Sequence, residues 1–173
     1  LKIGDGSTEA VNRLRAALIR LPGDLFVKTA LAHALWYAGR TQAAIAVLDD
    51  ALSQDGGTSE ALRLRGELLA DLNRAESALR DLDRIDYTDR PSSRAAWALA
   101  RRAHAGIGPA ASEELELVDS ADDSGPALLR VARVLRLEGE THTAAGLAAR
   151  AIRARRPPLP RHLRKEAERL MTP

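Results

Sequence analysis

The sequence predicts an all-α protein built as an α-solenoid, a tandem array of antiparallel helix pairs. Three observations predict this fold: helix-forming composition, apolar residues at helical spacing, and a repeat of 34 residues. The 173-residue chain is 45% hydrophobic but only 3% aromatic, so its core must consist of Leu, Ala, Val and Ile. Ala, Leu, Arg and Glu favour helices, and no convincing alternating strand pattern occurs.

Composition excludes several classes of function. The chain has no cysteine, which excludes a disulfide scaffold, a thiolate metal site and a cysteine nucleophile. We find no HExxH, phosphate-loop or GxSxG motif, and the acidic run 112–125 lacks the ligand spacing of a calcium loop. We therefore expect no enzyme activity, no cofactor and no metal.

Location is inferred from what the sequence lacks. No apolar run approaches the roughly 18 residues of a membrane span, and no secretory signal pattern is present. We therefore expect no membrane partner and take the cytoplasm as the default location. Because the chain begins at Leu1, we expect it to be part of a longer protein. The Ala-, Arg- and Leu-rich composition suggests a bacterial source.

The repeat is visible as equivalent residues 34 positions apart, and such periodicity is typical of solenoids. The best columns are Ala10/Ala44/Ala78, Leu14/Leu48/Leu82 and Leu35/Leu69. Gly39, Asn73 and Gly139 interrupt the helical pattern within repeats, and Pro or Gly pairs such as Pro22-Gly23 and Gly56-Gly57 end them. Asp24, Ser59 and Ser92 or Ser93 stand where helix N-caps are expected.

These signals predict ten helices, most with an apolar stripe at positions i, i+3, i+4 and i+7. Their expected ranges are 8–21, 25–38, 41–54, 59–72, 75–87, 93–105, 110–119, 126–138, 142–155 and 160–171. Lys28 and Arg65 stand at positions where an apolar residue would be expected, although their aliphatic stems could lie along an apolar surface.

The pattern resembles the tetratricopeptide repeat, a 34-residue helix–turn–helix unit. The best matches are ALAHALWYAGRTQAAIAVLDDALSQDGG (30–57), ALRLRGELLADLNRAESALRDLDRID (61–86) and ALLRVARVLRLEGETHTAAGLAARAIRARRP (127–157). The resemblance implies one array forming a right-handed superhelix. Its expected units are a half repeat at 8–21, repeats at 25–58 and 59–92, a degenerate repeat at 93–124, a repeat at 125–158 and a capping helix at 160–171.

In this family the first helix of each pair lines a concave groove, so the resemblance implies a protein or peptide partner. One stripe of that groove is rich in aromatic residues and another in arginine, and we expect an apolar anchor near Trp36 and acidic groups near Arg101 and Arg133. An alternative is that Trp36 and Tyr37 only pack between helices. The expected groove residues are Phe26, Thr29, His33, Trp36, Tyr37, Arg63, Glu67, Arg94, Trp97, Arg101, His104, Arg133 and Arg136.

Two other functions remain open. Val11, Leu14, Leu18 and Leu21 could form an apolar N-terminal edge for self-assembly. Opposite charges of residues 1–125 (net −5) and 126–173 (net +7) would favour head-to-tail contact. The chain could instead be a regulatory domain of a nucleic-acid-binding protein, with the basic run RARRPPLPRHLRK (153–165) contacting phosphates. That run lacks aromatic residues for base stacking, and its other interpretation is a helix end, linker and cap.

Overall fold

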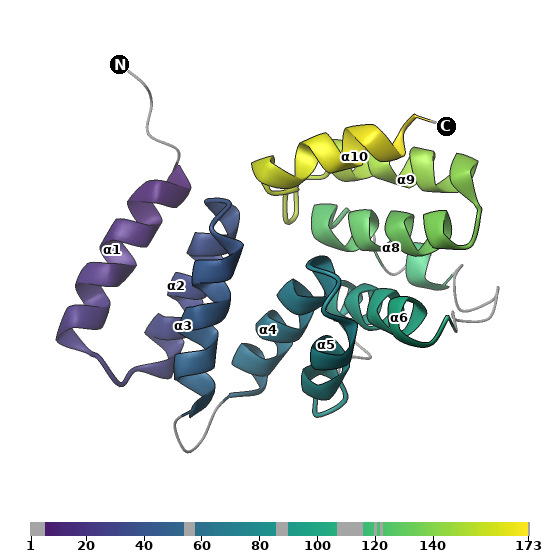
Figure 1. Ribbon diagram of the computed structural model, residues 1–173. Helices are drawn as coiled ribbons and strands as arrows, with labels where there is room; N and C mark the ends of the chain where they lie inside the picture. The colour runs from purple at the N-terminus through teal and green to yellow at the C-terminus, as the bar shows by residue number, and fades with distance from the viewer. Residues whose placement is uncertain are drawn as a thin grey trace.

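The computed structural model describes residues 6–53, 58–85, 90–106, 116–119, 121 and 123–172, and these residues form helices joined by short turns (Figure 1). The part of the chain so described contains no strand, which confirms the all-α prediction. Its helices are α1 (Gly6–Arg20), α2 (Leu25–Tyr37), α3 (Thr41–Ser53), α4 (Ser59–Asp71), α5 (Ala75–Leu82), α6 (Pro91–Ala105), α8 (Gly125–Leu137), α9 (Thr141–Arg153), the 3₁₀ turn η1 (Arg161–Leu163) and α10 (Arg164–Leu170).

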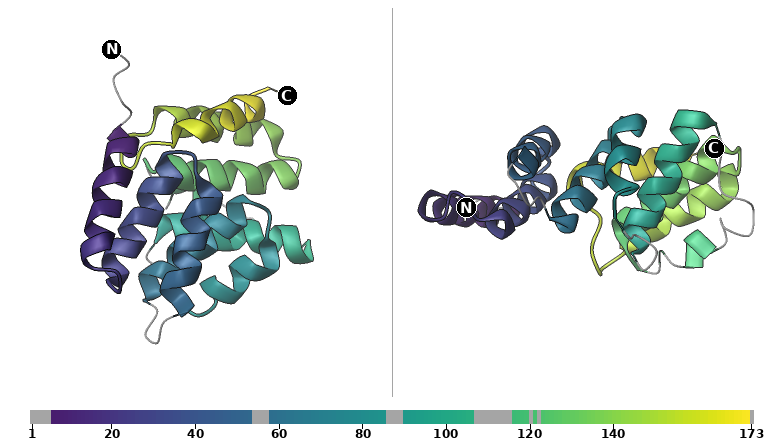
Figure 2. Two further views of the ribbon diagram at one scale, coloured as in Figure 1. Left: turned by 60° about the vertical axis from the view of Figure 1, so that its left-hand side comes forward. Right: turned by 90° about the horizontal axis from the view of Figure 1, so that it is seen from below.

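The helices stack in chain order, with α1 at one end of the array and α9 and α10 at the other (Figure 2). Helices α2 and α3, α4 and α5, and α8 and α9 pack as neighbouring pairs, while α6 contacts α4, α5 and α8. This succession of paired helices confirms the predicted solenoid.

The turns within the pairs form where the sequence predicts them. Gly39, Asn73 and Gly139 have φ values of 77°, 58° and 87°, the left-handed backbone that glycine adopts without strain and asparagine tolerates. Each ends the first helix of a pair sharply.

The helix N-termini agree with the prediction in part. Asp24 caps α2, because its Oδ1 accepts a hydrogen bond of 2.9 Å from Val27 N. Helix α4 is capped by Thr58 instead of Ser59, and the N-cap position of α6 is Arg90, which makes no side-chain cap. Ser92 and Ser93 are thereby free for another role, described below.

Two predicted helices differ at their ends. Helix α5 ends at Leu82 instead of continuing to residue 87, because the chain tightens there: Arg84 N bonds to Asp81 O and Ile85 N to Leu82 O. The capping helix begins as the 3₁₀ turn η1 before α10. Most of the predicted helix 110–119 lies outside the described residues. The part of it that is described, residues 116–119, is helical.

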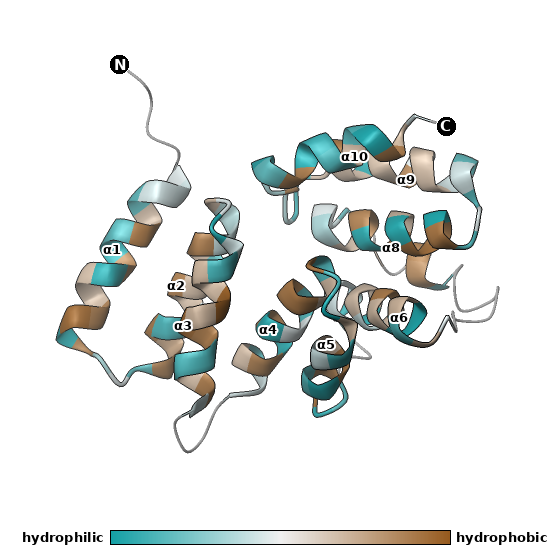
Figure 3. Cartoon of the chain, in the orientation of Figure 1, coloured by the Kyte–Doolittle hydropathy of each residue, from teal (hydrophilic) through white to brown (hydrophobic). Residues whose placement is uncertain are grey.

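The core follows the apolar faces of the helices (Figure 3). One buried cluster spans α1 to α6 and a second spans α6 to α10, so α6 belongs to both. Lys28 and Arg65 fit into this packing as ion pairs: Lys28 Nζ lies 2.6 Å from Asp50 Oδ2, and Arg65 binds Asp81 and Asp49. Their charges are therefore compensated at helix–helix contacts.

A segment that we name the C-terminal strap, residues 154–160, leads from α9 to η1 and crosses the start of α8. Gly125 N donates to Pro157 O at 2.9 Å, and a Cβ on Gly125 would lie 2.5 Å from the backbone nitrogen of Leu159. At its far side, the Tyr37 hydroxyl of α2 donates to Pro158 O at 3.2 Å. The strap thus joins the C-terminal end of the array to α2.

We predict that Gly125→Ala destabilises the fold by about 1–3 kcal/mol, since a new methyl group must displace the strap backbone. The matched control is Gly146→Ala in α9, where a Cβ would meet nothing within 4 Å. That change should stabilise by roughly 0.5–1 kcal/mol through helix propensity. Denaturant unfolding measures both, and equal effects of the two substitutions would show that the strap accommodates the methyl group.

Candidate functional site

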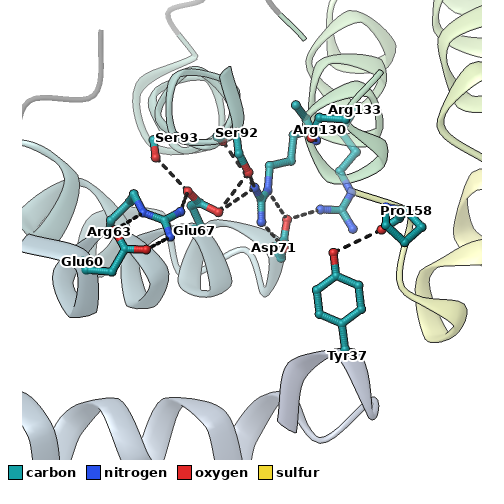
Figure 4. A network of polar contacts seen from close by, with 12 residues as sticks. Tyr37, Glu60, Arg63, Glu67, Asp71, Ser92, Ser93, Arg130, Arg133 and Pro158 are labelled. Carbon is teal, nitrogen blue, oxygen red and sulfur yellow. Dashed lines mark hydrogen bonds and ion pairs between the residues drawn. The ribbon is translucent and has the colours of Figure 1, made fainter. Parts of the chain in front are cut away.

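A buried network of charged side chains links α4 to α8 and α6 (Figure 4). Arg130 of α8 is only 1% exposed and lies between Glu67 and Asp71 of α4. Glu67 and Asp71 are one helical turn apart, so both carboxylates face α8. A buried charge of this kind needs paired hydrogen bonds on all sides to offset its desolvation.

The guanidinium of Arg130 is well matched to these acceptors. Its Nε and Nη2 donate to the two oxygens of Asp71 at 2.9 and 2.8 Å, and its Nη1 donates to Glu67 Oε2 at 3.1 Å. The serines at the start of α6 complete the shell: Ser92 and Ser93 donate to Glu67 at 2.9 and 2.7 Å. Such bidentate geometry is characteristic of arginine–carboxylate pairs.

The network extends towards the surface at both ends. Arg133 Nη1 donates to Asp71 at 2.7 Å, and its Nε and Nη2 bind Glu166 of α10 at 2.6 Å each. At the other end, Arg63 Nη1 donates to Glu67 at 2.7 Å and Arg63 also pairs with Glu60. The network therefore connects α4, α6, α8 and α10.

The network fixes the ionisation of its carboxyl groups. Burial alone would raise the pKa of Glu67, but the charges of Arg130 and Arg63 and the two serine hydroxyls lower it below its ordinary value. Burial likewise raises the pKa of Asp71, but the charges of Arg130 and Arg133 lower it more, so this pKa is also below its ordinary value. Both groups are therefore ionised at neutral pH.

Trp36 and Tyr37 are adjacent in sequence but serve different sides of α2. Trp36 is 3% exposed and lies in the core, with the guanidinium carbon of Arg130 5.8 Å from its ring centroid. The ring of Tyr37 meets Trp36 edge-on at 5.0 Å, and the exposed His33 lies 5.0 Å from Tyr37. Trp36 thus contributes mainly packing, while Tyr37 and His33 reach a surface.

Three cavities meet at His33, and we name them together the inner groove. The first, of about 410 Å³, lies between α2, α4, the starts of α6 and α8, and the strap. The second, of about 430 Å³, lies between the start of α2 and α4. The third, of about 560 Å³, lies between α1, α2 and the strap. Predicted groove residues that line at least one of them are Phe26, Thr29, His33, Trp36, Tyr37, Arg63 and Glu67.

The predicted groove residues of α6 do not line these three cavities. Trp97 Nε1 donates to Asp83 at 2.9 Å, beside α5, and Arg101 lies over the Trp97 ring at 4.8 Å. Arg94 pairs with Glu116 at 3.4 Å, and His104 is exposed. On α8, Arg133 is neutralised within the network and Arg136 is half-buried. The structure therefore does not bring these six residues together with His33.

Sequence reasoning missed the basic side chains that do reach the inner groove. Arg156 of the strap lines the first cavity, and Arg161 and Arg164 line the third; all three are exposed. None forms an ion pair with a described residue. The motif 153–165 was a signal for them, but only the contact between Tyr37 and Pro158 places it beside α2.

Two kinds of site, a metal centre and a membrane-spanning helix, are absent from the described part of the chain. Within residues 6–53, 58–85, 90–106 and 116–172 as far as described, no three His, Asp or Glu side chains are placed to hold a metal ion. None of the described helices has the length and apolarity that crossing a membrane requires. The inner groove offers an open surface with an imidazole, a phenol and guanidinium groups, which suits recognition.

We predict that Arg130→Ala lowers the free energy of unfolding by about 3–5 kcal/mol, because it leaves Glu67 and Asp71 buried without their main partner. The matched control is Arg13→Ala, which breaks an exposed pair with Glu9 and should cost less than about 1 kcal/mol. Urea unfolding followed by circular dichroism measures both. A loss as small as that of the control would contradict the structural importance of the network.

We further predict that acid destabilises the protein through Glu67 and Asp71. A carboxyl group with a lowered pKa stabilises the folded state above its unfolded pKa, here 4.5 and 3.8, and this contribution disappears as the pH falls through the folded pKa. The unfolding free energy should therefore decline below about pH 4.5, by up to roughly 1.4 kcal/mol per pH unit for each group. In Glu67→Gln/Asp71→Asn the decline should be shallower, whereas the exposed-site control Glu9→Gln should match the wild type; equal slopes for all three would refute the assignment.

Comparison with known proteins adds the family. Residues 35–103 match the family model described as tetratricopeptide repeat. This range includes the end of α2, all of α3, α4 and α5, and nearly all of α6. No curated protein matches the chain. Repeats of this family generally mediate protein–protein interactions. The paired helices and the turns at Gly39 and Asn73 agree with this match of residues 35–103 to the tetratricopeptide repeat.

Proposed function

We propose that this protein is a non-catalytic interaction module that binds a segment of a partner protein in the inner groove. The observation that carries the proposal is the meeting of three cavities at His33. They share side chains in succession, Arg63 and Leu64 on one side and Tyr37 on the other, so together they form one trough beside α2. An extended peptide needs such a continuous surface.

One end of the trough suits an apolar side chain. Phe26 is 82% exposed, and it lines the second cavity together with Ala30 and Leu64. An exposed phenylalanine of this kind gains free energy when a partner covers it. Arg63 also lines this end, and it is paired with Glu60 and Glu67, so an apolar side chain bound here would meet no unpaired charge from Arg63.

The other end suits an acidic side chain. Arg156, Arg161 and Arg164 surround the Tyr37 end, and guanidinium groups bind carboxylates through paired hydrogen bonds. This arrangement keeps the expected partner, an apolar anchor followed by acidic groups. The arginines proposed to bind the acidic groups are now those of the C-terminal basic segment instead of Arg101 and Arg133. Arg133 is already neutralised by Asp71 and Glu166.

Self-assembly through the N-terminal edge is a weaker candidate in this structure. Val11 is 1% exposed, and Leu14 and Leu18 pack against the same core, so they are turned towards α2. Of the residues proposed for that edge only Leu21 is largely exposed, at 53%, with Ile19 beside it at 82%. Two side chains form a small apolar surface for a stable dimer.

We predict that a random-peptide display on this protein enriches sequences with one large apolar residue near Asp or Glu. A labelled enriched peptide should bind the wild type. Arg161→Glu/Arg164→Glu should weaken binding at least about tenfold, because it reverses the charge of the arginines that face the acidic groups of the peptide. Phe26→Ser should weaken it by removing apolar contact area. Fluorescence anisotropy measures each dissociation constant.

The matched control is Lys165→Glu/Arg169→Glu, which makes the same charge change on α10 at exposed residues that do not line the cavities. It should change the affinity less than about threefold. Enriched peptides that bind all variants equally would disprove binding in the inner groove. Light scattering over a concentration series tests the alternative, since a monomer at every concentration excludes self-assembly of this chain.

A further inference from the structure

A second groove lies on the opposite side of α4 and has a different composition. This outer groove, of about 510 Å³, runs between α3 and α5 with α4 beneath it. Arg63 and Glu67 of α4 face the inner groove, whereas Arg65 and Leu69 line the outer one. Residues two apart on a helix point about 200° apart, so the two grooves are separate surfaces of the same helix.

Four arginines and two aspartates line the outer groove. Arg65 is fully engaged: its Nε and Nη2 donate to the buried Asp81 at 2.7 Å each, and its Nη1 donates to Asp49 at 2.8 Å. Both aspartates of the groove are therefore already bound to one arginine. The positive charges of Arg74, Arg80 and Arg84 remain for another anion.

These three arginines are arranged along one helix. Ser77, Arg80 and Asp81 lie on α5, Arg74 is its N-cap residue and Arg84 follows two residues after its end, and all five line the outer groove. Arg80 approaches Glu76 only to 3.9 Å, and both side chains are at least 70% exposed, so this pair neutralises little. The groove therefore carries an excess of positive charge along the whole length of α5.

We propose that the outer groove binds an acidic segment of a partner protein, independently of the inner groove. Guanidinium groups along a helix match a run of Asp or Glu side chains, and Ile45 and Leu69 give the groove an apolar floor for an aliphatic side chain between them. A nucleic acid fits less well, because no aromatic side chain lines the groove for base stacking and Asp49, 58% exposed, would meet the phosphates. Asp49 is also the group that an incoming carboxylate can replace on Arg65.

The test uses a fluorescein-labelled peptide of eight residues in which glutamate and leucine alternate. The anisotropy of the peptide is measured as the 173-residue chain is added, at low and at moderate salt concentration. The wild type should bind it, with an affinity that falls as salt rises. Arg74→Glu/Arg84→Glu should weaken binding at least about tenfold. The control with the same charge change is Arg15→Glu/Arg20→Glu at exposed residues of α1. A second arm, Arg161→Glu/Arg164→Glu, measures how much of the peptide binds in the inner groove of the proposed function. Circular dichroism confirms that every variant is folded.

Binding that is weakened in Arg74→Glu/Arg84→Glu but not in Arg15→Glu/Arg20→Glu supports the outer groove, whether or not the Arg161→Glu/Arg164→Glu variant is also weakened. Loss only in Arg161→Glu/Arg164→Glu places acidic peptides in the inner groove and overturns this inference while leaving the proposed function intact. Equal weakening in all three, or no binding to the wild type, shows that net charge alone was at work or that no site exists, and overturns it too. A labelled single-stranded oligonucleotide that binds more tightly than the peptide and depends on Arg74 and Arg84 would overturn the choice of a protein segment.

Discussion

The packing of this array depends on one buried interaction, the guanidinium of Arg130 held between Glu67 and Asp71. Successive pairs of a solenoid normally touch only their neighbours, through apolar faces. Here Arg130 of α8 reaches back to α4, past α6. It also donates to Ser92 at the start of α6, while Ser93 donates to Glu67. The hydrogen bonds of Arg130 to Glu67 and Asp71 form only at one distance between α4 and α8, so they specify that distance. Apolar side chains alone would tolerate several distances.

The position of the inner groove follows from the same interaction. Arg63 and Glu67 form one wall, and Trp36, in contact with Arg130, forms the base. Every arginine of the network is paired with carboxylates, so Arg133 and Arg63 are not available to a ligand. Free positive charge at the groove instead comes from the strap and from α10. The structure thus separates charges that build the fold from charges that face solvent, and α10 carries both, in Glu166 and Arg164.

Sequence alone was sufficient for the helices and their pairing, because those depend on local spacing: the 34-residue columns, the apolar stripes and the turn residues Gly39 and Asn73. It was insufficient for the site. Arg130 meets partners about 60 residues away, and nothing near it in the chain distinguishes it from the half-buried Arg136 or the exposed Arg150. Trp36 and Tyr37 lie about 100° apart on α2, so periodicity could not tell which one would be buried. The basic motif 153–165 was noticed, but its role depends on a contact between residues 121 positions apart.

The strap also has a mechanical meaning. A helical repeat array behaves as a spring, since small rotations between successive pairs add up to a large change in its curvature. The bond from Tyr37 to Pro158, together with His162 standing 3.4 Å from the position of a Gly39 Cβ, joins the end of α2 to the strap and to η1. A change in curvature that separates α2 from the C-terminal helices must therefore break these contacts.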